Sequence, residues 1–366
     1  MATKSKIVET AFRFGSGRYI QESGACSLLA EELLRLGCRA PFIIGGKTAL
    51  SLTLGSLSAS LEAAKLSYQM RYYTGFCCVE TCEALMSEPE FAACDCIVGV
   101  GGGNVSDAAK LMAARSNRPV IMVPTSAATC ACFTPLSVTY TPELRCAGSI
   151  HHKNEINCIL ADTDVLCLQP ERLLAAGVYD AAAKLIEIEQ RIKGMTADEM
   201  DVGLASSYAL SQHTYERMFA LFDRAVEGLN NKECNKALYD MIYLTVAATG
   251  MISGMARGSN QCAIAHKVYE NLRTLFPLTV KDFLHGEMVA IGLLVQLHYN
   301  GRENEVEPFR AGMRSHGMPT TLRDLGIEPT AENVAALYDK LVHSTAMAGT
   351  TPEEQERLTA ALAVIC

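Results

Sequence analysis

Three residues in the second half of the chain have side chains that commonly bind metal ions. They are Asp180, His266 and His285. Two imidazoles and one carboxylate, with a fourth position left open, make a catalytic zinc site. The long separations between them match no compact metal motif, and a histidine in an apolar helix is more often a hydrogen-bonded core residue. The residues alone leave both interpretations open.

A glycine-rich stretch in the first half has the composition of an anion-binding turn. Gly99–Gly103 follows the apolar run Cys96–Val98 and precedes a helical pattern, which predicts a strand, a turn and a helix. Glycines allow a ligand to approach the backbone closely, and the N-terminus of a helix favours negative charge. The spacing differs from G-x-G-x-x-G, so an ordinary turn that binds nothing is the alternative.

The segment after the next apolar run carries hydroxyl and thiol groups. Thr125, Thr129 and Thr134 could donate hydrogen bonds to a ligand or cap turns. Cys130 and Cys132 lie among them. A catalytic thiol needs a neighbouring base, and the sequence names none, so packed thiols are favoured here.

The elements that would position these groups fall into two halves. In residues 1–163, short apolar runs such as 41–44 and 119–124 alternate with helical patterns, which predicts a parallel sheet covered on both faces. Residues 164–366 have helical patterns only. Ligands of such sheets bind at the carboxyl ends of the strands. We therefore expect the active site in the cleft between an α/β domain and an all-helical domain.

Composition narrows the class of protein. The chain has 366 residues, of which 49% are hydrophobic and 20% charged, as in a soluble globular protein. A net charge of −8 argues against nucleic acid or an anionic membrane as the main partner. No apolar stretch follows Met1–Lys6, so no signal peptide is expected. The 15 cysteines, an odd number in mostly apolar surroundings, are typical of free thiols in the cytoplasm.

Taken together, these motifs resemble the glycerol dehydrogenases of the metal-dependent (iron-containing) alcohol dehydrogenase superfamily. Each motif is modest, but the ordered set is specific and spans nearly the whole chain. The matching residues are Gly17–Ile20, Gly101–Gly103, Asp107–Lys110, Val123–Thr125, Leu136–Val138, Asp180, His266, His285–Glu287 and Met318–Leu322.

The resemblance implies a dehydroquinate synthase-like fold, with a Rossmann-like dinucleotide-binding domain followed by an all-α domain. It implies that Asp180, His266 and His285 are the zinc ligands and hence the catalytic residues, and that the protein forms a homo-oligomer. The residues it places at the cofactor pyrophosphate are Gly102, Gly103, Asn104, Val105, Ser106 and Asp107, and those around the nicotinamide half are Thr125, Thr129, Thr134, Leu136 and Tyr140.

Two departures from the family pattern bear on metal and substrate. Iron enzymes of the superfamily have a histidine four residues after the aspartate, where this chain has Lys184, which favours zinc held by three ligands. Cys130 replaces an aspartate that contacts substrate in glycerol dehydrogenases. The surrounding segment, Thr129–Val138, resembles a hydroxycarboxylate dehydrogenase branch, which reduces small 2-oxo acids. Loss of the carboxylate also removes repulsion against an anionic substrate.

Other departures concern the cofactor and the shape of the site. Gly46 replaces the acidic residue that would bind the adenosine ribose, and Lys47 follows it, which favours NADP(H) over NAD(H). Tyr179 replaces a glycine beside the metal aspartate, and Tyr269 replaces a second histidine after His266. We expect Cys130, Tyr179 and His266 around the substrate, although the two tyrosines could also mean weakened metal binding.

The sequence thus predicts a metal-dependent dehydrogenase that transfers hydride between NAD(P)(H) and a small hydroxy compound. A 2-hydroxy or 2-oxo acid is preferred, and glycerol or another small polyol is the first alternative. A lyase resembling dehydroquinate synthase would need a cluster of basic residues, for which only Lys184 and Lys267 are available. A nucleotide-binding protein with a decayed catalytic site is the non-enzymatic alternative.

Overall fold

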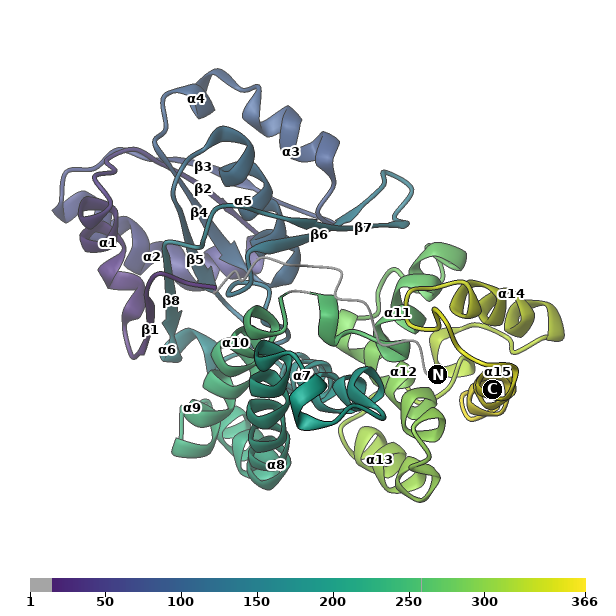
Figure 1. Cartoon of the computed structure of the whole chain (residues 1–366). Coiled ribbons are helices and arrows are strands. Elements are labelled where there is room, and N and C mark those ends of the chain that lie inside the picture. Colours follow the sequence, from purple (N-terminus) through teal and green to yellow (C-terminus); the bar gives the residue numbers. More distant parts are fainter. Residues whose placement is uncertain (1–14, 258) are drawn as a thin grey trace.

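The computed structural model describes residues 15–257 and 259–366. The N-terminal segment in which no signal peptide is expected lies outside the described residues. Figure 1 shows a sheet flanked by helices, built from the first half of the chain, beside a group of helices built from the second half.

The first half contains a six-stranded parallel sheet in the order β1-β8-β5-β4-β2-β3. Its inner strands are apolar and wholly buried, as expected of strands with helices on both faces. The strands are β1 (Tyr19–Glu22), β2 (Pro41–Gly45), β3 (Gln69–Tyr72), β4 (Cys96–Gly101), β5 (Val120–Pro124) and β8 (Cys158–Asp162).

Helices cover both faces of this sheet, and their apolar residues form two separate cores. Leu29, Leu33 and Leu57 pack on one face, whereas Ala109 and Met112 pack on the other. The elements are a 3-10 turn (Ala25–Leu28), α1 (Leu29–Arg35), α2 (Lys47–Ala63), α3 (Val79–Met86), α4 (Pro89–Ala92), α5 (Gly103–Ser116) and α6 (Thr163–Leu166).

A separate antiparallel hairpin connects the two halves. It consists of β6 (Leu136–Tyr140) and β7 (Cys146–His151). Strand β6 packs on α5, and β7 contacts α11 (Ile264–Leu275) in the second half. The hairpin is visible in Figure 1 as the extension that reaches from the sheet toward α11.

No described residue after Asp162 belongs to a strand, so the second half is helical. The predicted fold class, an α/β part followed by a helical part, is therefore confirmed, while the boundary at 163 stays a prediction. Besides α11, the longer helices are α7 (Glu171–Ile192), α8 (Val202–Asn231), α9 (Lys236–Tyr243), a π-helical turn (Leu244–Ala248), α10 (Thr249–Met255), α12 (His285–Tyr299), α13 (Glu303–Ser315), α14 (Ala331–Val342) and α15 (Pro352–Ala363).

Two glycines allow α7 to approach its neighbours without a side chain in between. A Cβ at Gly177 would lie 1.9 Å from the carbonyl oxygen of Ala127, in the segment after β5. A Cβ at Gly286, in α12, would lie 2.0 Å from the carbonyl oxygen of Ala176. The first contact joins the helical half to the carboxyl edge of the sheet, one turn before Asp180.

Two expectations from composition can be compared with the fold. All 15 cysteines are free, and most of them are buried. Within the part of the chain that the structure describes, no helix combines the length and the apolar character that crossing a bilayer requires.

Gly177→Ala tests the close contact between α7 and the carbonyl of Ala127 at the sheet edge. The added methyl group would overlap the Ala127 carbonyl, so we expect a loss of about 2 kcal/mol or more in the free energy of unfolding. Gly55→Ala is the matched control, because Gly55 is exposed within α2 and its Cβ would meet nothing within 4 Å. There the helix propensity of alanine should add about 0.5–1 kcal/mol. Urea denaturation measures both, and equal stability of the two variants would contradict the contact.

Candidate active site

The three predicted metal ligands come together from three different helices. Asp180 is in the middle of α7, His266 is in the first turn of α11, and His285 is the first residue of α12. The distance from Asp180 Oδ1 is 3.1 Å to His285 Nε2 and 3.6 Å to His266 Nε2. One potential ligand atom from each residue lies within 4.8 Å of the other two.

The environment keeps the Asp180 carboxyl in its anionic form. Asp180 and His266 are only 3% and 8% exposed. Burial alone would raise the pKa of Asp180, but the imidazoles of His285 and His266 outweigh burial and hold the pKa well below its ordinary value. An anionic oxygen beside two imidazole nitrogens is a donor set that suits a divalent transition metal ion such as zinc. The residues therefore fit the metal that the resemblance implies, and their role as ligands stays a prediction.

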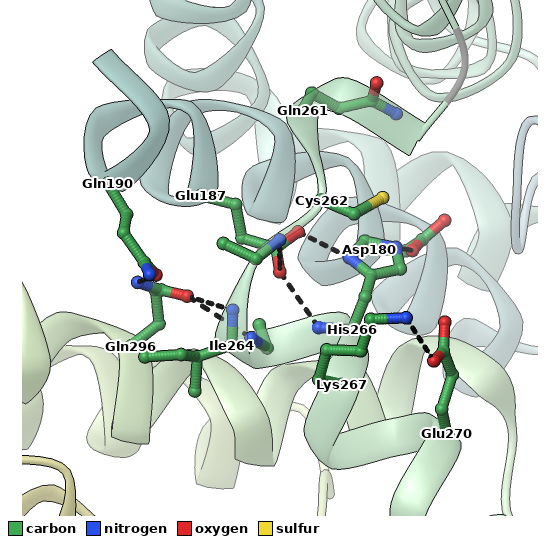
Figure 2. A network of polar contacts seen from close by, with 12 residues as sticks. Asp180, Glu187, Gln190, Gln261, Cys262, Ile264, His266, Lys267, Glu270 and Gln296 are labelled. Atoms are coloured by element: carbon green, nitrogen blue, oxygen red, sulfur yellow. Dashed lines mark hydrogen bonds and ion pairs between the residues drawn. The ribbon is translucent and has the colours of Figure 1, made fainter. Parts of the chain in front are cut away.

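Glu187 orients His266 from the side opposite Asp180, as Figure 2 shows. Its carboxylate is fully buried, and Oε2 lies 2.5 Å from His266 Nδ1. Oε1 accepts hydrogen bonds from the backbone N–H groups of Ala263, at 2.7 Å, and His266, at 2.9 Å. A carboxylate on one ring nitrogen fixes the tautomer and leaves the other nitrogen available to a metal. Glu187 is not among the residues predicted from the sequence, although it follows Asp180 by two helical turns and so shares its face of α7.

Backbone contacts hold the starts of the other two ligand-bearing helices. Gln296 Oε1 accepts from the N–H groups of Ile264 and Ala265, at 2.8 and 3.3 Å, at the beginning of α11 (Figure 2). Glu287 Oε2 accepts from the N–H of Leu284 at 2.7 Å, just before α12. Both imidazoles thus lie on helix starts that are fixed by buried side chains.

The glycine turn lies at the carboxyl edge of the sheet, where a dinucleotide is expected. Helix α5 begins at Gly103, and Gly102 before it supplies no side-chain cap, so the first N–H groups of the helix are free for an anion. A Cβ at Gly102 would lie 3.2 Å from Ser126 Oγ, and one at Gly103 would lie 3.4 Å from Thr129 Oγ1. The turn therefore faces the segment after β5. Asn104 is exposed beside it.

The later residues of the predicted pyrophosphate site face the interior instead. Val105 and Ser106 are buried, and the Ser106 N–H donates to the carbonyl of Gly102 at 3.0 Å. Asp107 Oδ1 pairs with Lys110 Nζ at 2.9 Å, and Oδ2 accepts from the N–H of Val138 at 3.2 Å. The structure does not support a contact between the Asp107 carboxylate and the cofactor, because that carboxylate is engaged inside the fold.

Lys110 fixes the segment that holds the predicted nicotinamide residues. Its ammonium donates to the carbonyls of Ala131, at 2.6 Å, and Thr134, at 3.0 Å, and it also bonds the carbonyl of Leu136. Thr129 Oγ1 accepts from the N–H of Ala131 at 3.0 Å. The role of Lys110 could not be predicted, because nothing in the sequence shows which carbonyls its side chain reaches.

At the start of this segment, Thr125 lies beside the glycine turn. Its N–H donates to the carbonyl of Gly101 at 3.3 Å, which joins the ends of β5 and β4. Thr125, Thr129 and Thr134 therefore lie in the segment between β5 and the hairpin, and Leu136 is the first residue of the hairpin.

One of the two unusual tyrosines lies in the site, and the other does not. The hydroxyls of Tyr140 and Tyr269 are hydrogen-bonded, and the Tyr269 ring meets His285 edge-on with 4.2 Å between ring centroids. Tyr179 is 1% exposed and packs edge-to-face against Phe309, with 5.2 Å between centroids. The expected substrate contact of Tyr179 is not supported, because successive helical residues point about 100° apart and this side chain enters the helical core.

The residues expected at the adenosine end lie on the neighbouring strand. Gly46 and Lys47 follow β2, which pairs with β4, so they share the carboxyl edge of the sheet with the glycine turn. Lys47 is exposed, and its Nζ lies 5.9 Å from the centre of the Tyr72 ring.

Lys110→Met tests the buried clamp on this segment. Removing the ammonium leaves the Asp107 carboxylate and several carbonyls without their partner, so we expect unfolding free energy to fall by about 3–5 kcal/mol. Lys236→Met is the control, since Lys236 is 81% exposed in a surface pair with Asp240 and should change stability by less than about 1 kcal/mol. Chemical denaturation monitored by circular dichroism checks both. A loss for Lys110→Met no larger than that of the control would refute the clamp.

Comparisons with known proteins agree with this arrangement. The family model for iron-containing alcohol dehydrogenases matches residues 16–163. The glycerol dehydrogenase of Thermotoga maritima is 32% identical over 319 residues, which cover 86% of this chain and 85% of that protein. Hydroxycarboxylate dehydrogenase A of Escherichia coli is 31% identical over 253 residues, which cover 68% of this chain and 67% of that protein.

Solved structures show the same fold over almost the whole length. Glycerol dehydrogenase from Schizosaccharomyces pombe superposes with a TM-score of 0.84 at 21% identity, covering 98% of this chain and 92% of that one. A probable glycerol dehydrogenase from Sinorhizobium meliloti gives 0.80 at 25% identity, covering 96% and 98%. The chain therefore belongs to the iron-containing alcohol dehydrogenase family, a family of metal-dependent dehydrogenases that act on CH–OH groups.

Proposed function

We propose that this enzyme transfers hydride reversibly between a nicotinamide dinucleotide and a small hydroxy compound, preferably a 2-hydroxy acid. In the reducing direction, a 2-oxo acid, NADPH and one proton give the 2-hydroxy acid and NADP⁺. The observation that carries the proposal is the convergence of Asp180, His266 and His285 on helices of which one, α7, contacts the segment after β5 that faces the glycine turn.

The protein's part in this reaction is to position reactants and ligands. Asp180, His266 and His285 would hold the metal, and zinc is favoured because Lys184 occupies the place of a fourth, histidine ligand. When bound, the metal would supply Lewis-acid stabilisation of the negative charge that develops on the substrate oxygen. Glu187 keeps His266 in one tautomer, and the segment fixed by Lys110 sets the position of the nicotinamide half.

The preference for NADP(H) rests on Gly46 and Lys47, the residues expected at the adenosine end of the cofactor. Gly46 leaves no carboxylate to accept from a ribose hydroxyl, and Lys47 offers an exposed ammonium one residue later. A cation without an acidic neighbour at this place suits a 2′-phosphate. The family as such implies NAD(H) and a divalent metal, so NADP(H) is the finer part of the proposal.

The preference for a hydroxy acid rests on Cys130 and on one of the relatives. Burial raises the pKa of the Cys130 thiol to about 11, so at neutral pH this position carries no charge to repel a carboxylate. Hydroxycarboxylate dehydrogenase A is among the relatives, although those named glycerol dehydrogenase are more numerous among the best matches. Glycerol or another small polyol is therefore the competing substrate.

The two non-dehydrogenase readings are less well supported. A lyase acting on a phosphate-bearing substrate would need a cluster of free cations, yet Lys267 pairs with Glu270 at 2.5 Å, which leaves Lys184 alone. A decayed catalytic site would require the bulk of Tyr179 and Tyr269 to fill the substrate pocket, yet Tyr179 packs against Phe309 in the helical core. Homo-oligomerisation and a cytoplasmic location stay predictions.

Turnover tests the proposed reaction. Protein loaded with zinc should oxidise NADPH when 2-oxobutyrate is added, and His266→Ala should lower kcat/KM by about 1000-fold or more while the circular dichroism spectrum is unchanged. Absorbance at the nicotinamide band measures the rate. Absence of turnover with a panel of 2-oxo acids, dihydroxyacetone, glycerol and diols would overturn the proposal, as would full activity of His266→Ala.

Cofactor choice is tested separately at Lys47. Lys47→Ala should lower the ratio of kcat/KM for NADPH to that for NADH by about tenfold, because it removes the ammonium proposed to bind the 2′-phosphate. Lys65→Ala is the matched control, since Lys65 is exposed just beyond the other end of α2 and should leave the ratio unchanged. If both variants gave the wild-type ratio, the adenosine end would lie elsewhere.

A further inference from the structure

A buried lysine lies on the face of α7 that forms the candidate metal site. Asp180, Lys184 and Glu187 are spaced by four and three residues, which places them on one face of the helix. Asp180 and Glu187 both contact His266, so this face is turned toward α11. Lys184 lies between them and is only 5% exposed. Asp180, Cys262 and Cys130 all act electrostatically on its ammonium, so that ammonium lies near the candidate metal site.

No partner within the described chain satisfies this ammonium. Lys184 makes no hydrogen bond or ion pair through its side chain with any residue that the structure describes. The two carboxylates on the same face are engaged, Asp180 with both imidazoles and Glu187 with the ring and backbone of His266. An ammonium that makes no hydrogen bond within the described chain gains from an anionic partner, and a ligand can bring one.

The two carboxylates that stabilise the charge of Lys184 electrostatically, Asp180 and Glu187, are themselves engaged with His266. Burial would lower its pKa, but Cys262 and Asp180 outweigh burial and hold the pKa above its ordinary value, so the lysine stays cationic. Cys130, which also lies within electrostatic range, is a neutral thiol at pH 7 because burial raises its pKa to about 11. An aspartate at position 130 would instead give Lys184 an anionic neighbour.

The charge balance of the site favours an anionic substrate. A divalent ion held by Asp180, His266 and His285 would add two positive charges. The carboxylates of Asp180 and Glu187 would offset these two charges, and the positive charge of Lys184 would remain. A polyol would leave that charge unpaired in a buried place. A monocarboxylate would pair with it.

We propose that Lys184 binds the carboxylate of a 2-oxo or 2-hydroxy acid and so sets the enzyme's preference for acids over neutral polyols. This inference rests on the proposed dehydrogenase function. It gives Cys130 a defined part as well, since a thiol in that position leaves Lys184 free for the substrate.

Substrates that differ only in the carboxylate test the proposal. We compare kcat/KM for 2-oxobutyrate with that for 1-hydroxybutan-2-one, in which a hydroxymethyl group replaces the carboxylate. Lys184→Met should lower the value for the acid by about 100-fold and leave that for the neutral ketone within about threefold. Lys184→Arg keeps the charge and should retain most of the preference. Lys267→Met is the matched control, because Lys267 is already paired with Glu270 and should leave the ratio unchanged.

A second variant, Cys130→Asp, tests the role of the Lys184 charge by giving the ammonium an anionic neighbour. Cys130→Asp should pair with Lys184 and lower the acid-to-ketone ratio by about 100-fold while Lys184 is intact. Equal losses on both substrates in Lys184→Met, or an unchanged ratio in both variants, would overturn the inference. If Lys184→Met does not fold, Lys184→Gln and Cys130→Asp decide by the same ratio.

A binding measurement separates this inference from the proposed function. Calorimetric titration of 2-hydroxybutyrate into the enzyme loaded with zinc and NADPH needs no turnover. Wild-type binding that weakens about 100-fold in Lys184→Met, with 1,2-butanediol unaffected, would support Lys184 even if no substrate of the panel were reduced. If the enzyme reduces 2-oxobutyrate but the acid-to-ketone ratio of kcat/KM is unchanged in Lys184→Met, the dehydrogenase function is supported and the inference about Lys184 is overturned.

Discussion

The candidate site depends on two carboxylates of one helix, α7, which lie beside the two ring nitrogens of His266. Glu187 lies 2.5 Å from Nδ1, and Asp180 Oδ1 lies 3.6 Å from Nε2. Both carboxylates come from α7, so the register between α7 and α11 determines where the ring lies. The close approach of α7 to the carbonyl of Ala127 then places that ring at the carboxyl edge of the sheet. The positions of the predicted metal ligands and of the segment after β5 are thus coupled through one helix.

Buried charge is the second constraint on this part of the molecule. Lys110 and Lys184 are both buried, but they differ in their hydrogen-bonding partners. Lys110 pairs with Asp107 and donates to carbonyls of the segment before β6, which makes it structural. Lys184 lies among groups that are neutral or already engaged. The same residue type therefore stabilises the fold in one place and, in the other, leaves a charge for a ligand.

The fold could be predicted from the sequence because alternating apolar runs and helical patterns are local signals, and the strands at 41–45 and 120–124 are found in the structure. The approach of Asp180 to His266 could not be derived from spacing, and only the ordered motifs of a known family suggested it. Glu187 and Lys110 escaped notice because their partners are set by packing. The packing of Tyr179 against Phe309 could not be predicted for a related reason, since its neighbour in sequence, Asp180, points to a different face of α7.

The central claim is that Asp180, His266 and His285 form one metal site, and metal stoichiometry tests it most directly. Protein stripped of metal, dialysed against zinc and then against buffer should retain one ion per chain by elemental analysis. Asp180→Asn and His285→Ala should each retain about a tenth of that or less while remaining folded. Wild-type protein that retains well below one ion, or variants that retain as much as the wild type, would contradict the account.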